Sequence, residues 1–310
     1  MLKATSSQLS ALTSFKIGGR ARELVTLTSI ADLQVAAGEL AGRTPVIIGG
    51  GTNVLLPDDN LELVWHLAPT DPSFSLVDEQ TIEVWAGNAT AKTAWELIRA
   101  GWAGLEKFTT LPGSLGGAIW GNAHAGDELV SDHVIEVTIF DLAAQQLATY
   151  QRFELEFGYD QSRCQHEPWV IVSARLRVTP GQPEALAAVA TSLMARKRQT
   201  QSFALASAGC FWQNPPNSEA LRAQFPQFAR RERFPAGFLI ESLGLTFPAG
   251  ARVTTGKHCS YLVNHGGASS REVRSLARQI QQQVQEKYGV VLVPEVAIYD
   301  QQGRRQVQLD

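Results

Sequence analysis

The stretch "SAGCFWQNPP", residues 207–216, places a cysteine between a glycine and a phenylalanine, shortly before two prolines. With an ordinary pKa of about 8.5, a thiol is a better proton donor than an alcohol. Free cysteines are also among the most frequently buried residues and often serve as small apolar side chains. From these residues alone, Cys210 is either a buried filler or a thiol placed to do chemistry.

Glu295 is a second chemically capable residue, because it interrupts the apolar run "VVLVPEVAI" of residues 290–298. An ionised carboxylate in apolar surroundings is costly unless it has partners or carries a proton. The alternative is a glutamate on an edge strand that faces water. The sequence pattern does not decide between the two.

Three glycine-rich stretches form a further signal: "SFKIGGRA" (14–21), "IIGGGTNVLL" (47–56) and "TLPGSLGGAIWGNAHAGD" (110–127). Glycine lets the backbone approach a ligand closely, and successive exposed N–H groups form an anion-binding concavity suited to a pyrophosphate. The alternative for any one stretch is a tight turn. Pro57 follows "GGGTN" too soon for a Rossmann helix, and no Gly-Lys-Ser/Thr follows it as in a P-loop.

Composition indicates a globular protein that acts on a small molecule. The chain has 310 residues, 44% of them hydrophobic, and a formal net charge of −3. The absence of a long basic run argues against nucleic acid or an anionic membrane as a partner. No apolar run reaches about 18 residues, so we expect a cytosolic protein without a membrane span. Three cysteines without a CxxC predict reduced thiols, and no histidine spacing predicts a metal site.

Apolar runs alternate with helical patterns, which predicts a mixed α and β architecture. Ser269 or Ser270 can cap a long amphipathic helix, with Glu272 in its first turn. The basic residues 196–198 are where we expect one domain to end. The predicted strands cover residues 45–48, 61–67, 81–87, 132–142, 169–178, 260–264 and 290–300, and the predicted helices cover 29–42, 91–102, 184–199, 236–245 and 269–289.

Seven motifs follow one another along the chain: "FKIGGRA", "IIGGGTNVLL", "TTLPGSLGGAIWGNAHAGD", "AGCFWQNP", "AGFLIESLGL", "KHCSYLVN" and "YGVVLVPEV". Together they resemble the UDP-N-acetylenolpyruvoylglucosamine reductase family. The matches span residues 11–300, and seven motifs in order are far more specific than a single glycine motif. The spacing after "AGFLIESLGL" resembles the short version of the family, which lacks a tyrosine-loop insertion.

The resemblance implies an α+β protein with the FAD-binding fold of the vanillyl-alcohol oxidase and p-cresol methylhydroxylase type. It implies an FAD-binding domain over residues 1–195, with α/β subdomains of about 1–60 and 61–195, and an α+β substrate domain over 196–310. FAD would be bound non-covalently, and NADPH would be the reductant. The implied FAD contacts are Ile48, Gly49, Gly50, Gly51, Thr52, Asn53, Val54, Pro112, Gly113, Ser114, Gly117, Ala118 and Asn122.

The family's reaction assigns roles to the two residues considered first. Reduced flavin N5 would deliver hydride to C3 of UDP-N-acetylglucosamine enolpyruvate, and a general acid would protonate C2 to give UDP-N-acetylmuramate, a peptidoglycan precursor. Cys210 matches the position of the family's proton donor. Glu295 matches its active-site glutamate, which helps to polarise the substrate, and a raised pKa would suit that role.

One position departs from the family pattern. A catalytic arginine usually follows the tyrosine in Tyr-Arg-x-Ser, but this chain reads "FGYDQSRC", so Asp160 stands in that place. A carboxylate would repel the developing enolate. Arg163 is the nearest replacement, with Arg175 and Arg177 more remote, although Arg163 can also be an ordinary surface cation.

The substrate contacts that we expect are Tyr159, Arg198, Asn214, Lys257 and His258, and we expect the enzyme to act as a monomer. Two other functions stay open from the sequence. One is a flavin-dependent alcohol or sugar oxidase with the same cofactor fold. The other is a non-catalytic protein that binds FAD or a UDP-sugar, as the loss of the arginine would allow.

Overall fold

The computed structural model of the chain describes residues 1–200 and 205–309. The chain forms two compact units, each built from several segments. Unit 1 consists of Met1–Ser7, Ala21–Gly51 and Glu62–Gln199, and unit 2 consists of Gln8–Arg20, Thr52–Leu61 and Thr200–Asp310. The division into functional domains at residues 195 and 196 stays a prediction.

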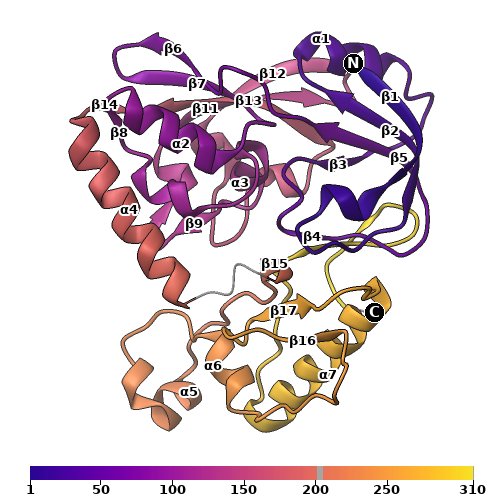
Figure 1. Cartoon of the computed structure of the whole chain (residues 1–310), viewed down its shortest axis with the longest axis vertical. Helices are drawn as coiled ribbons and strands as arrows, with labels where there is room; N and C mark the ends of the chain where they lie inside the picture. Colours follow the sequence, from indigo (N-terminus) through magenta and orange to yellow (C-terminus); the bar gives the residue numbers. More distant parts are fainter. Residues whose placement is uncertain (201–204, 310) are drawn as a thin grey trace. The chain divides into compact units, whose positions relative to one another are not determined.

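The larger sheet of unit 1 has five antiparallel strands in the order β12-β11-β13-β7-β6. Its central strand β13 reads "WVIVSARLR", and its first six residues are buried, as expected for a strand covered on both faces. Helix α3 packs against β7 and β13, as Figure 1 shows. The bounds are β6 (Ser75–Asp78), β7 (Thr81–Trp85), β11 (Val134–Asp141), β12 (Gln146–Gln151), β13 (Trp169–Arg177) and α3 (Leu115–Trp120).

The second sheet of unit 1 has the order β1-β2-β5-β3, and its β3 runs parallel to β5. Helix α1 begins after Ser29, whose side chain accepts a hydrogen bond from the Asp32 N–H. The bounds here are β1 (Leu2–Gln8), β2 (Arg20–Leu27), α1 (Ile30–Gly38), β3 (Val46–Ile48) and β5 (Leu61–Leu67). The remaining elements of unit 1 are α2 (Thr90–Arg99), β8 (Trp102–Ala103), η2 (Glu106–Thr110), β9 (His124–Ala125), β10 (Glu128–Leu129), η3 (Val130–Asp132), η4 (Arg152–Leu155), η5 (Arg163–Gln165), β14 (Thr179–Pro180) and α4 (Pro183–Thr200).

Unit 2 holds two three-stranded sheets, ordered β15-β17-β16 and β19-β18-β4. Helix α7 (Ser270–Tyr288) begins with a capping box between Ser269 and Glu272 and buries Val273, Ala277, Ile280 and Val284. The other bounds are η1 (Leu9–Leu12), β4 (Val54–Leu55), β15 (Ala206–Cys210), α5 (Glu219–Gln224), η6 (Pro226–Phe228), α6 (Ala236–Glu241), β16 (Val253–Thr255), β17 (Tyr261–Asn264), β18 (Ala297–Tyr299) and β19 (Arg305–Gln306).

Most of the predicted elements are confirmed, but several end earlier than predicted and one strand is largely wrong. The helix predicted over 91–102 ends at Arg99, and the one predicted over 236–245 ends at Glu241. The helix predicted over 29–42 ends at Gly38, four residues before the glycine expected to cap it. The strand predicted over 290–300 is wrong for residues 290–296, and only Ala297–Tyr299 forms a strand. Pro294 has no N–H to donate, which prevents a regular ladder there. In the two sheets of unit 1 described above, the strands β1, β2, β6 and β12 were not predicted.

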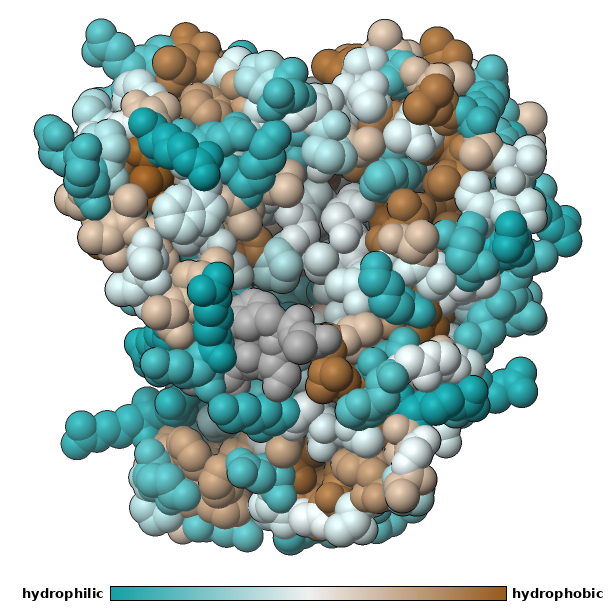
Figure 2. All heavy atoms as spheres, viewed as in Figure 1, coloured by the Kyte–Doolittle hydropathy of each residue, from teal (hydrophilic) through white to brown (hydrophobic). Residues whose placement is uncertain are grey.

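No helix among residues 1–200 and 205–309 is both long enough and apolar enough to cross a bilayer. On the face drawn in Figure 2, apolar side chains are scattered among hydrophilic ones. Such scattered exposure is ordinary for a protein surface.

Candidate active site

A cavity of about 210 Å³ opens in unit 1 where two of the predicted glycine-rich stretches meet. Gly49 and Gly50 follow strand β3, and Gly113 and Ser114 precede helix α3. The cavity is lined by Gly49, Gly50, His66, Leu67, Pro69, Gly87, Ala89, Gly113 and Ser114. The third stretch, "SFKIGGRA", is not among the lining residues, and its Gly18 packs closely against Leu9 and Leu56 in unit 2.

The two glycine loops touch so closely that side chains cannot fit between them. The Gly50 N–H donates to the Ser114 Oγ at 3.2 Å. A Cβ atom on Gly50 would lie 2.6 Å from the Gly113 Cα, and one on Gly49 would lie 2.0 Å from the Ser114 Oγ. Gly51 and Gly113 have φ values of 61° and 99°, a region that favours glycine. These glycines are therefore required for a backbone-lined cradle, which suits the phosphates of a dinucleotide.

The other predicted FAD contacts of unit 1 differ in what their side chains do. Ile48 and Ala118 are buried in the core, so only their backbone could face a cofactor. Pro112 and Gly117 are exposed beside the cavity loop. Ser114 caps α3 by accepting from the Gly117 N–H at 3.4 Å.

Part of the cavity wall was missed by the sequence reasoning. His66 and Pro69 come from the end of β5, and no motif marks them. Burial lowers the pKa of His66, so this imidazole adds no charge to the cavity at neutral pH. Gly87 carried a usable signal, because "WAGNAT" places a glycine at the end of the strand predicted over 81–87; β7 itself ends at Trp85. A Cβ on Gly87 would lie 2.5 Å from the Ala68 carbonyl oxygen.

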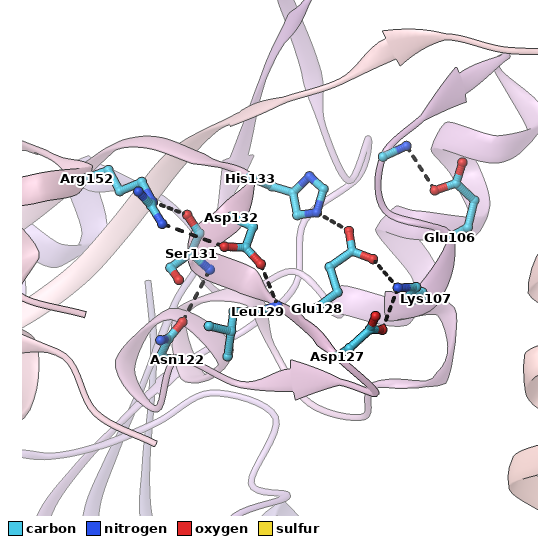
Figure 3. A network of polar contacts seen from close by, with 11 residues as sticks. Glu106, Lys107, Asn122, Asp127, Glu128, Leu129, Ser131, Asp132, His133 and Arg152 are labelled. Carbon is cyan, nitrogen blue, oxygen red and sulfur yellow. Dashed lines mark hydrogen bonds and ion pairs between the residues drawn. The ribbon is translucent and has the colours of Figure 1, made fainter. Parts of the chain in front are cut away.

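The Asn122 side chain, just after α3, links two loops of unit 1. Its Nδ2 donates to the Gly158 carbonyl at 2.8 Å, and its Oδ1 accepts from the Ser131 N–H at 3.3 Å. Figure 3 shows the second of these contacts within a polar network around the β9–β10 hairpin. In that network the Lys107 Nζ bonds Asp127 at 2.7 Å, and Glu128 contacts both Lys107 and His133. Asn122 thus holds in place the turn that carries Tyr159 and Asp160.

Asp160 has an unusual setting for a residue at the family's arginine position. It is buried, with 9% of its surface exposed, and its φ is 52°. Aspartate tolerates this left-handed conformation better than most residues. The His124 Nδ1 lies 3.8 Å from the Asp160 Oδ1, and the His124 ring stacks on Tyr159 with centroids 6.4 Å apart.

Arg163 is held by its neighbours within unit 1. Its Nε lies 3.2 Å from the Glu167 Oε1, and its guanidinium lies over the rings of Tyr150 and Trp169, at 5.5 and 4.8 Å from their centroids. The remote alternative Arg175 pairs with Glu136 at 3.0 Å on the large sheet. A stacked and paired cation of this kind has a defined position.

Cys210 lies in unit 2 at the end of β15, where it pairs across the sheet with Tyr261 of β17. Gly209, with a φ of 78°, lies in the irregular part of that ladder just before it. The cysteine is half-buried. Of the other two thiols, Cys164 is in the core of unit 1, where burial raises its pKa to about 11, and Cys259 packs against the core of unit 2.

Glu295 is a backbone neighbour of the segment that carries Cys210. Its N–H donates to the Phe211 carbonyl at 2.8 Å. Its own carbonyl accepts from the Asn53 Nδ2 at 3.3 Å, and Val54 pairs with Ala297 in the parallel ladder of β4 and β18. Residues 52–54 of the "GGGTN" motif region therefore belong to unit 2, beside Glu295, whereas its glycines belong to unit 1.

The predicted substrate contacts are distributed over both units. In unit 2, the Asn214 Oδ1 accepts from the Ala236 N–H at 2.9 Å and so fixes the start of α6. His258 packs on Gly237 and against the edge of Tyr261, and this partial desolvation lowers its pKa. Lys257 is exposed. In unit 1, Arg198 is exposed near the end of α4, and its neighbour Lys197 donates to the Thr110 carbonyl next to the cavity loop.

Known proteins match both units of the chain. Residues 21–148 match the FAD binding domain family, and residues 200–299 match the C-terminal domain of UDP-N-acetylenolpyruvoylglucosamine reductase. The enzyme of that name from Synechococcus sp. (strain JA-3-3Ab) is 31% identical over 295 residues, which cover 94% of this chain and 89% of that protein. The one from Gloeobacter violaceus is 31% identical over 293 residues, which cover 93% of each.

A solved structure agrees with these matches in fold. The crystal structure of UDP-N-acetylenolpyruvylglucosamine reductase from Thermus caldophilus superposes with a TM-score of 0.75 at 24% identity, over 96% of this chain and 98% of that one. This confirms the α+β architecture with an FAD-binding fold of the vanillyl-alcohol oxidase and p-cresol methylhydroxylase type. From the identity shared along nearly its whole length, the chain belongs to the UDP-N-acetylenolpyruvoylglucosamine reductase family.

Proposed function

We propose that this chain reduces UDP-N-acetylglucosamine enolpyruvate to UDP-N-acetylmuramate, with NADPH as the reductant and FAD as the cofactor. The observation that carries the proposal is the 31% identity to a reductase of that name over 94% of the chain. The product is a precursor of peptidoglycan, so the reaction serves cell-wall synthesis and, with it, cell shape and division.

The backbone-lined cavity of unit 1 supports FAD as the cofactor. Gly49 and Gly50 leave no room for a Cβ, and Ser114 ties the two loops together. A cradle of this kind suits the pyrophosphate, and the remaining predicted contacts from Ile48 to Asn122 would extend it along the cofactor. When bound, FAD supplies hydride transfer from NADPH, through N5, to C3 of the enolpyruvyl group.

Cys210 is the proposed donor of the proton that C2 receives. The S–H bond breaks as the C2–H bond forms, and the sulfur keeps the electron pair. Its half-buried position at a strand end supports this role, because a proton donor needs access to its substrate. Glu295, beside the same segment, is proposed to polarise the substrate carboxylate or the enol.

The third catalytic position is proposed for Arg163, which would stabilise the charge that develops on the enolate. Its stacking on two aromatic rings supports this assignment, because a positioned cation stabilises charge better than a mobile one. Tyr159, Arg198, Asn214, Lys257 and His258 are the proposed contacts of the UDP-sugar. We also propose that the enzyme acts as a monomer in the cytoplasm, without nucleic acid or membrane partners.

The first experiment uses the purified full chain. Its visible spectrum is recorded for bound flavin, and NADPH absorbance is followed before and after addition of UDP-N-acetylglucosamine enolpyruvate. We expect a yellow protein that consumes NADPH at a substantial rate only with this substrate. A yellow protein that stays idle with the substrate, or one that turns over an alcohol with oxygen instead, would contradict the proposal.

A further inference from the structure

His66 is the one titratable side chain among the residues that line the cavity of unit 1. Strand β5 pairs in parallel with β3, so that His66 lies beside Ile48, the residue directly before Gly49. Apart from Ser114, the other lining residues are glycines or apolar: Gly49, Gly50, Gly87, Gly113, Leu67, Pro69 and Ala89. No arginine or lysine among the lining residues can therefore balance the charge of a bound anion.

The imidazole of His66 is half-buried and available to a ligand. Within residues 1–200 and 205–309 it takes part in no hydrogen bond or ion pair, and neither ring nitrogen is fully buried. Burial lowers its pKa, so the ring is neutral at pH 7 before a ligand binds. A neutral imidazole has one N–H donor, and with an ordinary pKa of about 6.5 it can gain a second one near neutral pH.

The neighbouring elements bring no charged side chain into the cavity lining. Strand β3 and residues 49–53, 86–90 and 110–114 contain no charged residue and no histidine. No charged group in the described part of the chain contributes to the lowered pKa of His66. A charge close to His66 would therefore be supplied by the ligand. Ion pairs on β2, β5 and α2 join Arg22 to Glu62 at 3.2 Å, Arg43 to Glu23 at 2.7 Å, and Lys92 to Asp71 and Glu96 at 3.1 and 3.5 Å.

The cavity has room for only part of an FAD molecule. Its volume of about 210 Å³ is below the range of about 300–1,000 Å³ that is typical of ligand pockets. The part that suits its glycine backbone is the pyrophosphate, which carries negative charge on both phosphates. Such a group is costly to bury without a compensating charge, and it raises the pKa of an imidazole within about 4–6 Å.

We propose that His66 takes up a proton when FAD binds and that its imidazolium donates a hydrogen bond to an oxygen of the pyrophosphate. The inference rests on the proposed function only for FAD as the occupant of this cavity. The proton comes from solvent, and no covalent bond of FAD changes.

Proton uptake of this kind gives FAD affinity a defined dependence on pH. Because the complex binds the proton more tightly than the free protein does, the protonated protein binds FAD more tightly than the neutral one. FAD affinity should be lowest above the pKa of His66 in the complex and should rise as the pH falls through that pKa. It should level off below the pKa of His66 in the free protein.

The test is a titration of the full-length apoprotein with FAD, followed by flavin fluorescence at several pH values between about 5 and 8.5. A nearby opposite charge moves a pKa by about one unit or more, and one unit corresponds to a tenfold change in affinity. We expect the wild type to bind FAD about tenfold or more tightly at the lower end of this range. His66→Gln can donate a hydrogen bond but cannot gain a charge, so its affinity should not change with pH. Equal pH profiles of the two proteins would overturn the inference.

His265→Gln is the matched control, because it removes an exposed imidazole of unit 2 that bonds the Thr254 Oγ1 at 2.8 Å. It should keep the pH dependence of the wild type, and loss of that dependence would contradict the assignment to His66. Calorimetry adds a measurement that needs no variant. The binding enthalpy of FAD at pH 6.5 is compared in two buffers with different enthalpies of ionisation. We expect net uptake of a fraction of one proton, and no uptake would refute the inference even if His66→Gln failed to fold.

Turnover separates this inference from the proposed function. A wild type that binds FAD but does not reduce the enolpyruvyl substrate with NADPH refutes the proposed reaction, and the FAD titrations still decide the role of His66. A wild type that turns over, but whose FAD affinity is independent of pH, refutes only the His66 inference. A wild type that binds no FAD refutes both.

Discussion

Substitution of Gly50 by alanine should weaken FAD binding strongly, because this position has no room for a side chain. The new Cβ would lie 2.6 Å from the Gly113 Cα and 2.8 Å from both the Gly113 carbonyl carbon and the Ser114 nitrogen. These are backbone atoms, so they cannot swing aside as the end of a flexible side chain can. One of the two cradle loops must move.

The required movement can be estimated from the geometry. Ordinary contacts of a Cβ begin at 3.4 Å, so the loops must separate by about 0.8 Å, which is 3.4 minus 2.6. Overpacking of this kind typically costs about 1–3 kcal/mol. The separation also stretches the 3.2 Å bond from the Gly50 N–H to the Ser114 Oγ. If this cost weakens the FAD-bound state, FAD affinity drops by a factor of about 5 to 150.

The assay is a titration of the apoprotein with FAD, followed by quenching of flavin fluorescence, together with a thermal melt of each variant. Gly38→Ala serves as the control, because no heavy atom lies within 4 Å of its Cβ position near the end of α1. It should bind FAD like the wild type and be equally or slightly more stable. Wild-type FAD affinity in a folded Gly50→Ala variant would refute the reasoning that these loops form the cradle.

Three further outcomes follow from single side chains. Cys210→Ala should bind FAD and accept electrons from NADPH normally but form product slowly, and full turnover in single-turnover kinetics would disprove its role as the acid. Arg163→Gln should lower the rate of product formation at least tenfold. The variant should still fold, because the lost ion pair with Glu167 is partly exposed and worth about 1 kcal/mol or less. An unchanged kcat would show that Arg163 has no catalytic role. The Ala144 N–H and other donors hold the pKa of Asp141 below its usual range, so its stabilising effect is present above about pH 3.9 and is lost as the pH falls through the folded-state pKa. Asp141→Asn should therefore melt below the wild type at pH 7, by a margin that shrinks toward pH 3, and a constant margin in thermal melts would contradict this.

Local patterns made some of the fold predictable. The helix over 270–288 was predictable because its capping box of Ser269 and Glu272 and its apolar stripe all lie within one continuous segment of the sequence. The apolar run of β13 and the glycine loops around Gly50 and Gly113 were visible for the same reason. Each of these features depends on residues close together in the sequence.

Features that depend on distant pairing were not predictable. The register that places Tyr261 opposite Cys210 follows an irregular ladder around Gly209, and no local pattern specifies it. His66 reaches the cavity only because β5 pairs with β3. The strand predicted over 290–300 failed because an apolar run does not show whether each backbone N–H finds a partner, and Pro294 has no N–H. The run is not uniformly buried either, since Val291 and Val293 are exposed.

The segmented make-up of unit 2 has a consequence for how the chain folds during synthesis. Strand β4 pairs in parallel with β18, so Val54 cannot pair with Ala297 until the ribosome has added 243 more residues. Ribosomes add about 5–20 residues per second, so the delay is roughly 10 to 50 seconds. Phe15, Ile17 and Leu55, which belong to the core of unit 2, emerge early and have no core to enter during that time. These apolar side chains are where chaperones and nascent-chain aggregation would act first.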